Sequence, residues 1–229
     1  MNIGGLQKVS LIDYPGEICA VIFTRGCDFR CGYCYNAELV LPERYAELIP
    51  EQEVLAFLRG RRGRLDAVTI TGGEPTWQAD LPGFIRKVKE LGFLVKLDTN
   101  GVNPEMLKEI IDRKRVDYIA MDIKAPLEKY RDVININIDT RRIAASIALI
   151  MGSGVPCEFR TTVVKSQLDE QDILAIGKLI KGARRYVLQK FLPDKVLDAS
   201  FLDRTTYEED YLRRLCGMLK NDVGECAVR

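Results

Sequence analysis

Residues 17–34 read EICAVIFTRGCDFRCGYC, an apolar run followed at once by three closely spaced cysteines. The first part is rich in β-branched residues and predicts a buried strand, and the glycine after it indicates a loop. Cys27, Cys31 and Cys34 fall on that loop in the pattern Cys-x3-Cys-x2-Cys. The stretch therefore predicts a strand that brings three thiols to the loop at its carboxyl end.

The strand pattern occurs six times along the chain, with helical patterns between the strands. The predicted strands are Glu17–Thr24, Asp66–Thr71, Phe93–Asp98, Asp117–Asp122, Cys157–Lys165 and Arg185–Phe191. The predicted helices are Glu51–Leu58, Leu81–Leu91, a helix capped by Asn103, Thr140–Met151, Asp169–Ile180 and Tyr207–Leu219. Such alternation predicts an α/β fold with a parallel sheet and right-handed crossovers. We expect a partial (β/α)6 TIM-like barrel with parallel strands and outer helices.

The length and composition indicate an ordinary globular chain that needs no disulfides. At 229 residues, with no repeat or flexible linker, we expect a single domain, with its core at about residues 17–193 and a helical extension at about 194–229. The 34 basic and 33 acidic residues nearly balance, so there is no global attraction to nucleic acid or anionic lipid. The basic run 59–64 could suggest RNA binding, but the solvated end of a helix explains it more simply.

The amino terminus shows no secretory signal, and no run of 18 apolar residues occurs, so we expect a cytoplasmic protein without a membrane span. The chain contains no histidine, which removes the commonest general base and the imidazole ligand of many metal sites. Three of the seven cysteines crowd into eight positions, unlike a disulfide framework. In a reducing compartment such a cluster indicates metal or redox chemistry.

The cysteine spacing fits an iron–sulfur cluster. Three thiolates so close in sequence can bind three irons of a [4Fe–4S] cubane, which leaves the fourth iron open to a small molecule. A structural zinc site is an alternative, but without histidine its fourth ligand would have to be an acidic residue or a distant cysteine such as Cys216 or Cys226. Three unligated thiols on a polar loop are a further alternative.

The motif of Cys27, Cys31 and Cys34, with Tyr33 before the last cysteine, resembles the signature of the radical S-adenosylmethionine (SAM) superfamily. The resemblance implies that the open iron chelates SAM through its amino and carboxylate groups. One electron would then break a sulfur–carbon bond to give methionine and a 5′-deoxyadenosyl radical. We accordingly expect Tyr33, Cys34 and Tyr35 to contact the cofactors.

A second motif, Gly72-Gly73-Glu74, ends the second predicted strand. Taken alone it could be a turn in which glycine lets the backbone approach a ligand closely. It also resembles the GGE motif of the same superfamily, which hydrogen-bonds the methionyl amino group of SAM. The resemblance implies a SAM contact at all three residues.

The third and fourth predicted strands end in Asp98-Thr99 and in Asp122, with Lys124 close behind. An ion pair and a capping turn would explain these residues without any ligand. They also resemble the glycyl-radical-enzyme activases, and this implies that Asp98, Thr99 and Asp122 hold a monovalent cation beside SAM. Lys124 would then contact the SAM carboxylate.

The fifth and sixth predicted strands carry the remaining candidates. Arg160 has a guanidinium suited to a carboxylate, and in the activases an arginine at this place approaches SAM. Gln189 and Phe191 lie where some activases offer a histidine near the adenosine part of SAM. After the cysteines, Tyr35 stands where the activases commonly have a histidine, and Asn36 follows it as an asparagine does in the activases.

The amino-terminal segment 4–16 contains Ser10-x-x-Asp13-x-Pro15-Gly16, which most resembles the anaerobic ribonucleoside-triphosphate reductase activating proteins. The resemblance extends from Gly4 to about Pro193. It implies a monomeric activase that abstracts a glycine Cα hydrogen from a partner glycyl radical enzyme, either a ribonucleotide reductase or a pyruvate formate-lyase-like enzyme. A flavodoxin or ferredoxin would supply the electron.

Two other functions remain open from the sequence. One is a radical SAM enzyme that acts on a small molecule, like the carboxy-deazaguanine synthases. The other is a non-catalytic iron–sulfur electron carrier or zinc protein, which would have no need of the GGE-like motif. No cysteine-rich insert follows Cys34 before Thr71, so auxiliary clusters are not expected.

Overall fold

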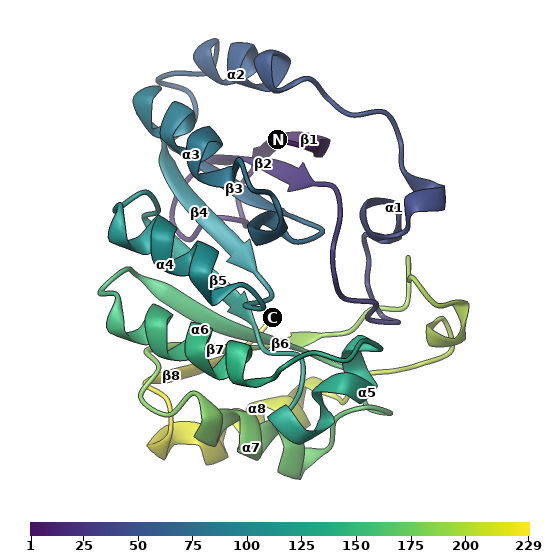
Figure 1. The fold of residues 1–229 in the computed structure, drawn as a ribbon. Helices are drawn as coiled ribbons and strands as arrows, with labels where there is room; N and C mark the ends of the chain where they lie inside the picture. Colours follow the sequence, from purple (N-terminus) through teal and green to yellow (C-terminus); the bar gives the residue numbers. More distant parts are fainter.

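A single curved sheet contains every strand of the protein (Figure 1). The computed structural model describes all of residues 1–229. The strands follow one another in chain order: β1 (Ile3–Ser10), β2 (Cys19–Thr24), β3 (Ala67–Gly72), β4 (Leu94–Thr99), β5 (Tyr118–Asp122), β6 (Cys157–Val163), β7 (Arg185–Lys190) and β8 (Glu225–Val228). Strands β2 to β8 are mutually parallel, whereas β1 is antiparallel to β2.

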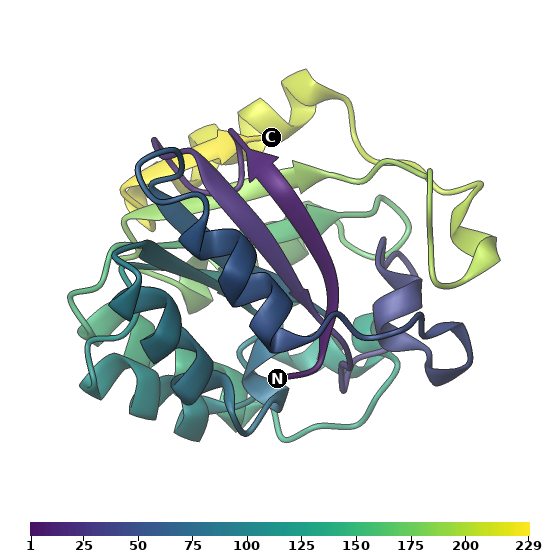
Figure 2. The ribbon, with the colours of Figure 1, turned by 90° about the horizontal axis from the view of Figure 1, so that it is seen from above.

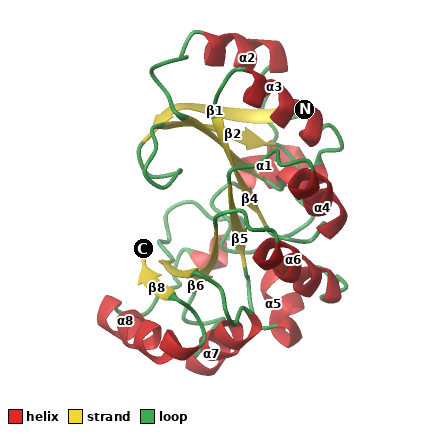
Figure 3. Ribbon diagram, turned by 90° about the vertical axis from the view of Figure 1, so that its left-hand side faces the viewer, coloured by secondary structure: helices red, strands yellow, loops and turns green.

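The main helices lie on the outer face of the curved sheet (Figure 3). They are α2 (Glu51–Arg59), α3 (Leu81–Glu90), α4 (Pro104–Asp112), α5 (Tyr130–Ile134), α6 (Arg141–Gly152), α7 (Glu170–Leu179) and α8 (Glu209–Met218). The one-turn helix α1 (Ala37–Val40) lies apart from this layer, close to the segment near residue 200, as the view from above shows (Figure 2). The predicted α/β partial barrel with outer helices is therefore confirmed.

The sequence patterns form these elements for simple physical reasons. Residues 19–22 of β2 are fully buried, as expected for a parallel strand covered on both faces. Helix α3 buries Leu81, Phe84, Ile85 and Val88, the apolar stripe that its sequence predicted. Asn103 accepts a hydrogen bond from the Met106 amide and so caps α4. All six predicted strands and all six predicted helices are present.

Neither edge strand, β1 or β8, was predicted from the sequence. Strand β1 carries a glycine pair and three exposed residues, so its apolar pattern is weak. Strand β8 has only four residues, and it pairs with β7. The carboxy-terminal segment was expected to be a helical extension, and this is wrong in part because the segment also supplies a strand that widens the sheet.

No helix of the structure has both the length and the apolar content that crossing a membrane requires.

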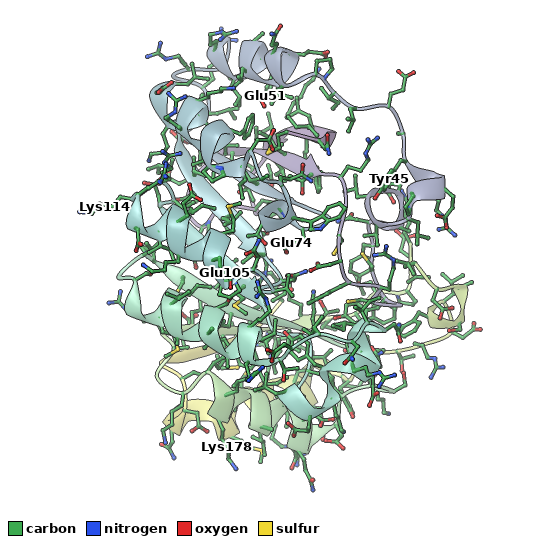
Figure 4. All side chains as sticks on the ribbon, viewed as in Figure 1. Tyr45, Glu51, Glu74, Glu105, Lys114 and Lys178 are labelled. Atoms are coloured by element: carbon green, nitrogen blue, oxygen red, sulfur yellow. The ribbon has the colours of Figure 1, made fainter.

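The buried side chain of Glu74, labelled in Figure 4, follows β3, and its carboxylate is hydrogen-bonded to the end of β4. It accepts hydrogen bonds from the Thr76 amide (2.9 Å) and hydroxyl (2.6 Å), from the Thr99 hydroxyl (2.8 Å) and from the Asn100 amide (2.6 Å). Only 1% of Glu74 is exposed. Burial raises the pKa of this carboxyl to about 7, although its four donors favour the charged form.

This buried carboxyl predicts a pH-dependent stability. Because the folded state holds the Glu74 proton up to about pH 7 and the unfolded chain releases it near 4.5, stability should fall as the pH rises between these values. The glutamine of Glu74→Gln does not titrate. The free energy of unfolding of the variant should therefore lie below that of the parent by a margin about 1–3 kcal/mol smaller at pH 8 than at pH 5. Denaturant unfolding of cluster-free protein measures this difference, and a difference that is constant with pH would contradict it.

Cys216 of α8 and Cys226 of β8 face each other as free thiols, with their Sγ atoms 2.6 Å apart. Both belong to the carboxy-terminal segment, and their contact links its helix to its strand. Sulfur atoms this close can form a disulfide with little movement of the backbone.

We expect oxidised glutathione to join Cys216 to Cys226, with two glutathione thiols released for each disulfide formed. Peptide mapping under non-reducing conditions would detect the linked pair. The Cys216→Ser variant, treated in the same way, should give no such link, with Cys226 recovered as a free thiol or as a mixed disulfide with glutathione. Recovery of both parent thiols in the alkylated form after oxidation would show that the contact does not support a disulfide.

Candidate functional site

A cavity of about 960 Å³ lies at the carboxyl ends of the parallel strands. This is the edge where parallel α/β folds place their working residues. The predicted site residues that line it are Cys27, Cys31, Tyr33, Cys34, Tyr35, Gly72, Gly73, Glu74, Asp98, Thr99, Asp122, Lys124, Arg160 and Gln189. Residues from six strand ends thus meet in one place.

The cysteine-bearing loop is held by backbone hydrogen bonds from three directions. Glu74 N donates to Gly26 O (2.7 Å), which joins the loop to the end of β3. Arg30 N donates to Ile134 O (2.9 Å) at the end of α5. Gly32 O accepts from Asp198 N (3.0 Å), which belongs to the segment that precedes α8. The three thiols therefore sit on a fixed loop although it has no regular secondary structure.

The glycines of the GGE-like motif are needed for packing against this loop. Gly72 has a φ of +121°, and a Cβ there would lie 2.3 Å from the Thr24 amide nitrogen. A Cβ on Gly73 would lie 2.0 Å from the Gly26 carbonyl oxygen. From the sequence, both glycines were expected to let the backbone approach a ligand closely. In the structure their missing side chains make room for the backbone of β2 and the cysteine loop.

The donor set of this loop fits a cubane cluster. The Cys27, Cys31 and Cys34 side chains all line the cavity, and burial raises the pKa of each thiol, that of Cys31 to about 11. Bound irons would supply the positive charge that buried thiolates need. No three Cys, Asp or Glu side chains converge on a single-ion position. A cubane does not require such convergence because each thiolate binds its own iron.

A buried network of charges, called the charged wall below, also lines the cavity. Arg160 bridges two carboxylates, with Nη1 donating to Asp98 (3.1 Å) and Nε to Asp122 (2.8 Å). Lys124 Nζ donates to the other Asp122 oxygen (3.0 Å). Burial alone would raise the pKa of Asp122, but the Arg160 and Lys124 cations outweigh it and hold that pKa below its ordinary value.

One member of this network was missed by the sequence analysis. Lys96 of β4 is almost completely buried, and its Nζ donates to the second Asp98 oxygen. Three cations therefore surround two carboxylates, which leaves one positive charge in excess. The signal in the sequence was a lysine inside an otherwise apolar strand, two positions before Asp98 and so on the same face.

Aromatic side chains pack against the tyrosines of the cysteine loop. Phe191, expected to contact SAM, does not line the cavity and is only 1% exposed. It stacks on Tyr35 with ring centroids 6.1 Å apart, and it meets Tyr33 and Phe201 edge-on. The structure therefore gives Phe191 a packing role, and of the two residues proposed in place of the histidine only Gln189 reaches the cavity.

Tyr33 remains close to the charged wall. Lys124 Nζ lies 5.8 Å from the centre of the Tyr33 ring, and the Tyr33 hydroxyl is buried without a hydrogen-bond partner. Asn100, another residue that the sequence analysis did not select, donates from Nδ2 to Asp28 (3.1 Å) and lies 3.9 Å from Cys27 Sγ. Asn100 precedes Gly101, and an Asn-Gly pair is typical of turns, so nothing in the sequence indicated that Asn100 lies near the cysteines.

Comparison with known proteins identifies relatives of the whole chain. MJ1227 of Methanocaldococcus jannaschii, whose name assigns it provisionally to the glycyl-radical enzyme activating enzymes, is 35% identical over 99% of this chain and 95% of its own. The 7-carboxy-7-deazaguanine synthase of Thermococcus kodakarensis is 28% identical over 80% and 78%. The pyruvate formate-lyase-activating enzyme of Streptococcus mutans is 24% identical over 93% and 94%.

Solved structures share the fold. SuiB of Streptococcus suis bound to SAM superposes with a TM-score of 0.69 at 17% identity, over 91% of this chain and 51% of SuiB. This chain therefore spans about half the length of SuiB. The model of the radical SAM superfamily matches residues 21–177, from β2 into α7. Because that match covers well over half of the chain and MJ1227 matches nearly all of it, this protein belongs to the radical SAM superfamily.

Proposed function

We propose that this radical SAM enzyme activates a partner glycyl radical enzyme. The observation that carries the proposal is the similarity to MJ1227, which extends over 99% of this chain and leaves little of either protein unmatched. The match to a pyruvate formate-lyase-activating enzyme likewise covers nearly both whole chains. A partner of the ribonucleotide reductase or pyruvate formate-lyase kind is the substrate that these similarities favour.

The site residues divide between the two cofactors in this proposal. Cys27, Cys31 and Cys34 would bind the [4Fe–4S] cluster, with SAM in the cavity beside it. When bound, the cluster and SAM supply a 5′-deoxyadenosyl radical, which takes the hydrogen atom of a glycine Cα. The Glu74 oxygens already accept four hydrogen bonds, so contact with the SAM amino group falls to the backbone of Gly72 and Gly73.

The charged wall would bind the carboxylate of SAM. The excess positive charge of its three cations is complementary to one carboxylate, and Lys124 lies in the cavity where it can donate to it. Arg160 already bridges two aspartates, so its proposed role is to hold the wall in place. Gln189 lines the cavity at the end of β7 and would face the adenosine part of SAM.

The cavity and its rim favour a protein substrate. Its volume lies at the upper end of the range of ligand pockets, roughly 300–1,000 Å³, which leaves room beside SAM for a peptide loop. Leu192, just after the carboxyl end of β7, is 63% exposed and lines the cavity. Exposed apolar residues beside a site are typical of surfaces that meet another protein.

The proposal extends to the setting of the reaction. A flavodoxin or ferredoxin would provide the single electron that each cleavage of SAM consumes. The protein would work in the cytoplasm as a monomer and without nucleic acid. A second candidate function, favoured by the similarity to a 7-carboxy-7-deazaguanine synthase, is radical chemistry on a small molecule held in the same cavity.

The cluster assignment predicts that Cys31→Ala abolishes the iron–sulfur absorbance and reduces SAM cleavage to background. The assay is anaerobic reconstitution with iron and sulfide, followed by SAM and dithionite and quantification of 5′-deoxyadenosine. Cys157→Ala is the matched control because Cys157 is partly exposed on β6 and does not line the cavity. Full cleavage by Cys31→Ala would overturn the assignment.

The activase assignment predicts a glycyl-radical doublet in electron paramagnetic resonance spectra when the reduced enzyme, SAM and the correct partner are mixed. Leu192→Ser should lower the radical yield by a larger factor than it lowers SAM cleavage without partner, because Leu192 is exposed at the rim of the cavity. Active SAM cleavage with no doublet from any candidate partner would instead favour the small-molecule function.

A further inference from the structure

The buried network gives the predicted cation ligands other partners. The resemblance to the activases implies a monovalent cation held by Asp98, Thr99 and Asp122 beside SAM. The structure brings these three residues to the same cavity. Whether they fit such an ion depends on which of their oxygen atoms are free to bind it.

Each of those oxygens is already engaged by another group of the protein. The Asp98 oxygens accept from Lys96 and from Arg160, and the Asp122 oxygens accept from Arg160 and from Lys124. The Thr99 hydroxyl donates to Glu74 (2.8 Å) and accepts from the Gly101 amide (3.1 Å). The partners of the four carboxylate oxygens are three cations, so a further cation would meet a net positive charge. The residues therefore do not fit a bound monovalent cation.

Lys96 places a buried positive charge next to Asp98, one of the predicted ion ligands. Its side chain is 3% exposed, that of Asp98 is 11% exposed, and Asp98 provides the only salt bridge that Lys96 makes. A buried ammonium with one carboxylate partner is costly unless that pair is maintained, so both side chains are held in one arrangement. Strand β4 places Lys96 two residues before Asp98, on the same face of the sheet.

We propose that the Lys96 ammonium supplies the positive charge that a bound monovalent cation would otherwise supply, so that this enzyme binds SAM without such an ion. Lys96 is a positioning residue in this proposal, because it acts through Asp98 and Arg160 on the wall that faces SAM. A charge fixed to the chain is present before SAM arrives and needs no ion to be recruited from solution. The proposal rests on SAM binding alone and not on the identity of the substrate.

The direct test uses the parent holoenzyme with its oxidised cluster. Equilibrium dialysis with radiolabelled SAM would be compared in choline chloride and in potassium chloride at equal ionic strength. We expect the two dissociation constants to agree within about twofold, since the wall is already complete. Several-fold tighter binding in potassium chloride would overturn the proposal. Neither reductant nor partner enzyme is needed, so the result is independent of the activase assignment.

Lys96→Ala provides the complementary test. In choline chloride its SAM affinity should fall about tenfold or more, because the Asp98 carboxylate loses its ammonium. Ammonium chloride or potassium chloride should restore much of the affinity by placing a small cation in the vacated space, an effect that a merely structural role would not produce. Lys89→Ala is the matched control, since Lys89 pairs with Asp117 on the partly exposed surface.

Folding of the variant is checked by circular dichroism and by its cluster absorbance. If Lys96→Ala does not fold, Lys96→Gln retains a side chain of similar reach without the charge, and the same salt series applies. A folded variant that binds SAM as tightly as the parent in choline, or whose weakened binding no cation restores, would show that Lys96 does not stand in for an ion. If neither variant folds, the parent comparison still tests whether SAM binding needs a monovalent cation, and tighter binding in potassium chloride still overturns the proposal.

Discussion

The close approach of two backbone segments, the end of β3 and the loop after β2, is the constraint on which the site depends. Gly73 N donates to Thr24 O and Glu74 N donates to Gly26 O, at 2.8 and 2.7 Å. These bonds extend the pairing of β2 and β3 past the ends of the strands and into the cysteine loop. Side chains at 72 or 73 would collide with that backbone, so glycine is required there. The position of the three thiols follows from this contact.

The Glu74 carboxylate continues the same construction towards β4. By accepting hydrogen bonds from Thr99 and from the Asn100 amide, it fixes the strand end from which Asp98 faces the cavity. All four hydrogen bonds that its oxygens accept serve this role, which explains how a conspicuous acidic residue in a site motif can stabilise the structure. The cysteine loop and the charged wall are thus held at fixed positions relative to each other.

The six inner strands could be predicted from the sequence because each is a short apolar run buried on both faces, as β2 shows. The three cysteines could be predicted because their chemistry depends on local spacing. Strands β1 and β8 could not, since edge strands need no continuous apolar pattern. The same holds for Phe191, whose place behind Tyr35 depends on tertiary packing.

Lys96 shows the limit of motif-based reasoning most clearly. A motif identifies Asp98 and Asp122 as candidates, but it does not show which groups already occupy their oxygens. That information depends on the side chains of neighbouring strands, which only the fold brings together. The family resemblance predicted that Asp98, Thr99 and Asp122 lie together, and the structure brings them to one cavity. It gave no sign of the cations that surround their carboxylates.

The central claim is that Cys27, Cys31 and Cys34 hold a cubane whose fourth iron is open to SAM. Mössbauer spectroscopy of protein reconstituted with ⁵⁷Fe, before and after addition of SAM, tests this claim most directly. The account predicts that one iron of the four changes its isomer shift when SAM binds, while the three thiolate-bound irons keep theirs. A spectrum in which SAM changes no iron, or in which the iron is mononuclear, would contradict it.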